Sequence, residues 1–145
     1  MTGFSLLELL FIIGITLLLA ATTIPIYGGL QVSSQLNETT SQIIQTIRIA
    51  KERSVARIND SAHGVFFDTA NKKYTLYQGF AWPGTIIREE ILASAFSLST
   101  TQADINFSKG LGIPNILATV TITLTHAASG SRQITINSFG AVEKQ

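Results

Sequence analysis

The side chain best placed for chemistry in this sequence is the carboxylate of Glu8, because it stands alone in an apolar stretch. From Phe4 to Ile26 the chain reads FSLLELLFIIGITLLLAATTIPI, with no other charged residue. A carboxylate in apolar surroundings is costly unless a cation pairs with it or it reaches water. Glu8 is close to the N-terminus, so one interpretation is an interfacial position that keeps it hydrated. The other is that Glu8 is held for a cationic partner.

The apolar stretch around Glu8 predicts a helix that spans a membrane. It contains about 20 consecutive, mostly apolar residues, the length that crosses the hydrocarbon core of a bilayer. A helix in the core of a small soluble protein is rarely apolar on all sides. A secretory signal peptide is disfavoured, because no basic residue precedes the stretch and an acid interrupts it.

The residues around Glu8 resemble the prepilin processing motif of the type IV pilin and type II secretion pseudopilin family. From Gly3 to Leu10 the chain reads GFSLLELL, and the family pattern is G-F-[ST]-L-[IL]-E-[LM]-L. The resemblance implies cleavage by prepilin peptidase after Gly3 and N-methylation of the new terminal residue, Phe4. It also implies that Glu8 is the family's assembly glutamate and that Pro25 is its helix-interrupting proline.

This resemblance gives Glu8 a physical role. Cleavage after Gly3 would leave a positive amine at Phe4, which Glu8 of a neighbouring subunit could neutralise inside an apolar filament core. An unpaired charge is expensive there, so the pair would fix the axial position of each incoming subunit. Only Met1 and Thr2 precede Gly3, whereas leaders of the family usually contain Lys or Arg. The leader is therefore either very short or begins upstream.

The first half of the chain predicts one long helix with an irregularity at Pro25. Proline removes a backbone donor and clashes with the carbonyl of Ala21, so a kink or local melting is expected there. A second helical pattern runs from Gln31 to Asn59, with an apolar stripe at helical spacing that should pack on a globular head. The stripe consists of Leu36, Thr40, Ile43, Ile44, Ile47, Ala50, Ser54 and Ile58.

The second half of the chain predicts a head made mainly of antiparallel strands. Val120, Ile122 and Leu124 alternate with threonines, the pattern of a half-buried strand. The expected strands are His63–Asp68 and Lys73–Tyr77 as a hairpin, then Ile86–Leu92, Ala103–Phe107, Ala118–Thr125 and Arg132–Ser138. The predicted class is α+β, a long N-terminal helix packed on an antiparallel sheet. Its expected parts are a leader at 1–3, a membrane or filament-core helix at 4–30, an amphipathic helix at 31–59 and the head at 60–145.

Two further segments resemble the GspH/FimT-like minor pseudopilins. One is IAKERSVA from Ile49 to Ala56, at the end of the amphipathic helix. The other is the closing pair of strands, Thr119–Thr125 and Ile134–Val142, with Gly140 near the end. Major pilins share the N-terminal motif, so this resemblance of the head favours a minor subunit without excluding a major one.

No catalytic, metal or cofactor site is predicted, and the protein is not expected to be an enzyme. There is no cysteine, so thiolate chemistry is excluded. His63 and His126 flank strands and are expected to be exposed turn residues. Glu89 and Glu90 are adjacent on a strand, so their side chains should point to opposite faces rather than form an acid–base pair. Asp68 with its neighbouring polar residues is expected to stabilise a turn.

The sequence therefore predicts a structural subunit of a type IV pilus or a type II secretion pseudopilus. The resemblance implies a single-pass protein of the bacterial inner membrane with its head outside the cytoplasm, and later a periplasmic or extracellular filament. The implied partners are prepilin peptidase, other pilins, the assembly platform and its motor ATPase. A DNA-binding minor pilin is one alternative, and a membrane-anchored enzyme is another. DNA is weakly supported, because the net charge is +1 and basic residues of the helix and head are scattered, among them Arg48, Lys51, Arg53, Arg57, Arg88, Lys109, Arg132 and Lys144.

Overall fold

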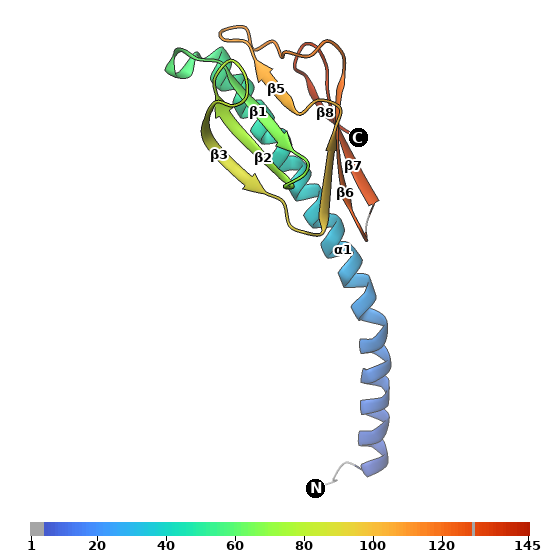
Figure 1. The fold of residues 1–145 in the computed structure, drawn as a ribbon. Coiled ribbons are helices and arrows are strands. Elements are labelled where there is room, and N and C mark those ends of the chain that lie inside the picture. Colours follow the sequence, from blue (N-terminus) through green and yellow to red (C-terminus); the bar gives the residue numbers. More distant parts are fainter. Residues whose placement is uncertain (1–4, 129) are drawn as a thin grey trace.

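One long helix and a β-rich head make up the protein. The computed structural model describes residues 5–128 and 130–145, and of residues 22–28 it describes the backbone only. Helix α1, Leu6–Val55, begins far from the head and ends against it, and a short 3-10 turn, Ile58–Asp60, follows. The predicted arrangement of one long N-terminal helix with its second half in the head is confirmed (Figure 1).

Helix α1 ends at Val55, earlier than the predicted end at Asn59. The last turn closes when the Ala56 N–H donates to the Glu52 carbonyl at 2.8 Å. Arg57 and Asn59 then both adopt a φ of 53°, the left-handed region in which a right-handed helix cannot continue. No glycine in the sequence indicates that the helix ends here. The spacing of the apolar residues therefore predicted an end that is four residues too late.

Two antiparallel sheets of four strands each form the head. The first has the order β3-β2-β1-β5 and the second the order β4-β6-β7-β8. All six expected strands are present, with ends that differ by a few residues, whereas β4 and β8 were not predicted. The strands of the first sheet are β1 His63–Asp68, β2 Lys73–Gln78, β3 Thr85–Ile91 and β5 Asp104–Phe107. Those of the second are β4 Phe96–Thr100, β6 Val120–His126, β7 Gly130–Ile136 and β8 Val142–Lys144.

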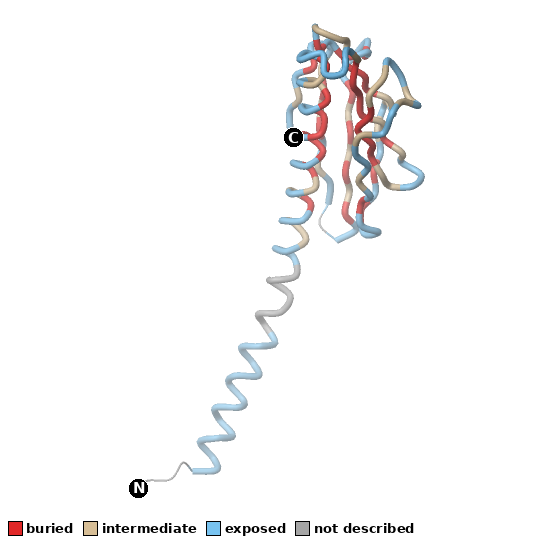
Figure 2. Tube along the Cα trace, turned by 90° about the vertical axis from the view of Figure 1, so that its left-hand side faces the viewer, coloured by how far each residue is buried: buried red, intermediate tan, exposed pale blue. Residues whose placement is uncertain are grey.

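The core lies between the second half of α1 and both sheets, where Figure 2 shows the buried residues in red. The predicted stripe of α1 is buried from Leu36 to Ser54, which confirms the helical periodicity. Ile58 is the exception and is 39% exposed, because it lies beyond the end of the helix. Strand β6 alternates between buried and half-buried residues, as the sequence predicts.

Both histidines are buried, so the expectation that they are exposed turn residues is wrong. His63 is 0% exposed and His126 is 8% exposed. His63 begins β1, and its backbone N–H donates to the Ser54 Oγ of α1 at 2.8 Å. The His126 ring meets the ring of Phe96 edge-on at 5.1 Å. Each residue is next to a turn in sequence, but the strand register directs its side chain inward.

Protonation of His63 is unfavourable in this position. Burial lowers the pKa of the imidazole below its ordinary value of 6.5, and the positive charge of Arg53 lowers it further. The nearby backbone of Ser61 raises the pKa by a smaller amount. Neither ring nitrogen of His63 has a hydrogen-bond partner among the described residues. The unfolded chain therefore binds this proton more tightly than the folded one.

We expect the stability of the head to fall with acid through His63. The contribution of the neutral imidazole is complete above pH 6.5 and is lost as the pH falls below that value. Replacing His63 with leucine should remove this part of the pH dependence, up to about 1.4 kcal/mol per pH unit. Denaturant unfolding of both proteins across roughly pH 5–8 measures it. A difference between the two that does not change with pH would contradict the prediction.

Candidate assembly interface

The first half of α1 carries an apolar surface that the head does not cover. Every large apolar side chain described between Leu6 and Leu19 is exposed, the least exposed being Ile12 at 47%. In Figure 2 this part of the helix extends away from the head as a uniformly exposed rod. A contiguous apolar surface of this kind marks an interaction site with protein or lipid. Its members are Leu6, Leu7, Leu9, Leu10, Phe11, Ile12, Ile13, Ile15, Leu17, Leu18 and Leu19.

Glu8 is the acidic residue in the first turn of α1. Its backbone N–H donates to the carbonyl of Ser5 at 3.0 Å, and its side chain is exposed. The first turn is the positive end of the helix dipole, which stabilises a carboxylate modestly. No ion pair of the described residues includes Glu8. The carboxylate is therefore available to a cation from another molecule.

The remaining predicted site residues lie wholly or partly outside the described part of the chain. Gly3 and Phe4 are outside it, and so is the side chain of Pro25, where a kink was predicted. The predicted membrane segment, 4–30, likewise includes residues 4 and 22–28. Among the residues that are described, no helix combines the length and the apolarity that crossing a membrane requires.

Several acidic residues of the head are engaged in local interactions. Glu89 pairs with Lys73 at 3.0 Å, and Glu90 pairs with Arg88 at 2.7 Å. Asp68 accepts hydrogen bonds from the backbone and the side-chain amide of Asn71, which lower the pKa of its carboxyl and stabilise the turn between β1 and β2. No group of three or more potential metal ligands occurs among the described residues.

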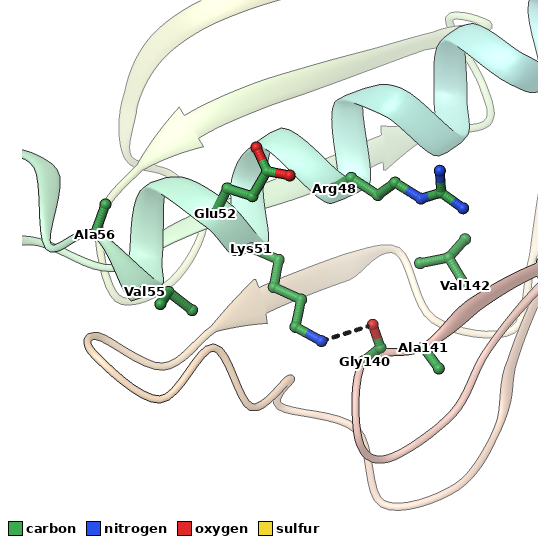
Figure 3. A pocket seen from close by; sticks show the side chains of 8 residues that line it. All are labelled: Arg48, Lys51, Glu52, Val55, Ala56, Gly140, Ala141 and Val142. Carbon is green, nitrogen blue, oxygen red and sulfur yellow. Dashed lines mark hydrogen bonds between the residues drawn. The ribbon is translucent and has the colours of Figure 1, made fainter.

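A groove between α1 and the turn before β8 was missed by sequence reasoning. It has a volume of about 490 Å³. The Lys51 side chain reaches across it, between Val55 and Arg48, to the carbonyl of Gly140 at 3.1 Å (Figure 3). Its ammonium also donates to the carbonyl of Phe139 at 3.2 Å. The lining residues are Arg48, Lys51, Glu52, Val55, Ala56, Gly140, Ala141 and Val142. The two walls lie some ninety residues apart in the chain, so no local sequence pattern reveals the groove.

Comparison with known structures identifies this architecture. The chain superposes on the minor pseudopilin EpsH from the type 2 secretion system of Vibrio cholerae, with a TM-score of 0.59. The chain has a pilin-like fold. The match covers 76% of this chain and 95% of EpsH at 10% sequence identity, so the likeness is one of fold. No protein-family model matches the sequence, and neither does any curated protein.

The pilin-like fold confirms the predicted α+β class and the predicted likeness of the head to minor pseudopilins. In this chain the head packs on the second half of α1. The first half is then left to contact other molecules. Cleavage after Gly3, methylation of Phe4 and the assembly role of Glu8 stay predictions.

Proposed function

We propose that the protein is a structural subunit of a type IV pilus or a type II secretion pseudopilus that assembles through the first half of α1. The observation that carries this proposal is the exposed apolar surface from Leu6 to Leu19, which extends beyond a head with its own core. Bundling these helices removes the apolar surface from water, which is the main driving force of association. The pilin-like fold supports the same function.

Before assembly, the same helix holds the subunit in the bacterial inner membrane, with the head outside the cytoplasm. The exposed apolar surface supports this position, since lipid covers it as well as neighbouring helices do. Prepilin peptidase then cuts after Gly3, and the assembly platform with its motor ATPase moves the subunit into the filament. The protein acts by packing, as a structural subunit and not as an enzyme.

The charge pair between Glu8 and the terminal amine of Phe4 sets the position of each subunit. In a bundle of apolar helices, a buried amine or carboxylate that has no partner of opposite charge destabilises the bundle strongly. Only the axial offset that brings Glu8 of one subunit to the N-terminus of another satisfies both charges. The apolar contacts thus provide the affinity between subunits, and the charge pair determines their axial offset.

We expect the mature protein to begin at an N-methylated Phe4. Intact-mass measurement of the protein from a host with prepilin peptidase should show the loss of Met1 to Gly3 and the gain of one methyl group. The same gene in a host without the peptidase should give the uncut chain. A chain that keeps Met1 in both hosts would contradict processing at this motif.

A further inference from the structure

Four cationic side chains lie along one seam between α1 and the end of the second sheet. Arg48 and Lys51 line the groove from the side of α1. About three helical turns before Arg48, the Asn37 Oδ1 accepts from Arg132 Nε at 3.2 Å and from Lys144 Nζ at 3.0 Å. Asn37 and Lys51 are about 21 Å apart along the helix at its standard rise. The seam is therefore long enough for an extended segment of several residues.

Among the residues that the structure describes, no carboxylate forms an ion pair with these four cations. The ion pairs of the described residues are Lys73–Glu89, Arg88–Glu90 and Lys109–Asp60, and none includes a residue of the seam. The Lys51 ammonium donates to two backbone carbonyls. Arg132 and Lys144 both donate to the side-chain amide oxygen of Asn37. Neutral acceptors leave the positive charge uncompensated, so the seam attracts anionic groups.

The nearby acids do not neutralise the seam. Glu52 lines the groove, but Figure 3 shows its carboxylate on the other side of α1 from the Lys51 ammonium. Glu143 alternates with Val142 along β8, so its side chain points to the opposite face of the sheet. There it lines a different cavity, beside Thr119 and Thr135.

The backbone of β8 adds a second kind of recognition. Strand β8 is at the edge of its sheet. Gln133 and Gln145 exchange both backbone hydrogen bonds, at 3.2 and 2.9 Å. In an antiparallel pair this pattern alternates, so the N–H and C=O groups of Val142 and Lys144 point away from β7. A free edge with such groups can accept a further strand.

We propose that this seam binds an acidic, extended segment of a partner protein as an additional strand beside β8. Acidic side chains of the segment pair with Arg48, Arg132 and Lys144. The residues that alternate with these acids in the added strand point to the other face of the sheet, away from α1. This interaction uses the second half of α1 together with the second sheet, and it goes beyond the assembly function of the first half of α1.

A peptide fits this seam better than a nucleic acid does. A groove of about 490 Å³ has room for a few side chains and not for a DNA duplex. Single-stranded nucleic acids are bound by stacking on aromatic rings, and no aromatic side chain lines the groove. The free backbone groups of β8 are complementary to a polypeptide.

The test measures binding of a labelled peptide to the full chain in detergent. The probe is a peptide of about seven residues with alternating glutamate and valine, a length that covers the seam. The double variant R48Q/K144Q should bind it about tenfold more weakly, because two charge pairs are lost. The matched control K73Q/R88Q removes two positive charges from the other sheet and should bind within about twofold of the wild type.

A second measurement tests the added strand. Amide exchange at Val142 and Lys144 should slow when the peptide binds, and a peptide with proline in place of valine should not slow it, because proline lacks the N–H donor. Unchanged affinity in R48Q/K144Q would overturn the proposal. So would equal binding of a peptide with lysine in place of glutamate, unprotected amides at β8, or tighter binding of a single-stranded oligonucleotide that displaces the peptide.

Discussion

Replacing Glu8 with alanine is expected to abolish filament assembly while the head stays folded and processing proceeds. Glu8 is exposed in the single subunit, far from the core, so its loss removes no contact within the head. In the filament, its absence leaves the terminal amine of Phe4 without a partner among apolar side chains. An unpaired buried charge of this kind costs about 3–5 kcal/mol, which corresponds to at least about a hundredfold in subunit affinity.

Two further variants separate charge from shape and position. Glu8→Gln keeps the size and hydrogen-bonding groups of the side chain but not its charge, so it should fail to assemble as well. Glu38→Gln removes an exposed acid from the second half of the same helix and should assemble normally. The measurement is the amount of each variant in sheared filaments relative to the total. Normal filaments from correctly processed Glu8→Ala protein would show that register does not depend on this charge.

Periodicity accounts for most of the fold that could be predicted. The stripe of α1 and the alternation of β6 each follow from one face packing on one core, which a sequence records directly. Strand β4 was not predicted, although its buried residues Phe96 and Leu98 alternate with polar ones, because two apolar residues in a segment of five are too few to establish a period. The end of α1 escaped because non-glycine residues adopt the left-handed conformation there.

The candidate site divides in the same way. Glu8 was predictable because its chemistry is local, one acid in an apolar stretch with a processing motif around it. The environment of His63 was not, because adjacency to a turn does not say to which face a strand directs its first side chain. The basic seam was not either, since Lys51 meets Gly140 and Asn37 meets Lys144 only through the tertiary fold. Spacing along the helix indicates only that its cations are scattered, on a surface that faces solvent or another subunit.

Replacing Phe107 with alanine is expected to destabilise the head more than any exposed substitution. Phe107 ends β5 and is 0% exposed; its ring lies beside Gly140, where an added Cβ would come within 3.3 Å of Phe107 Cε1, and its backbone forms a β-bridge with Pro114. Deleting a fully buried phenylalanine ring leaves a cavity and costs about 3–5 kcal/mol. Small domains are stable by only about 5–15 kcal/mol, so the variant should lose a large part of its total stability.

The chain offers a matched control for this prediction in Phe139, whose side chain is 82% exposed. Phe139→Ala removes the same ring from the surface and should change the free energy of unfolding by about 0.5 kcal/mol or less. The single tryptophan, Trp82, stacks on Phe66 at 4.6 Å, so its fluorescence reports unfolding of the head in denaturant. Equal losses in the two variants would mean that Phe107 does not lie in a packed core. Because both substitutions remove the same atoms, the difference between them isolates burial as the source of the stability.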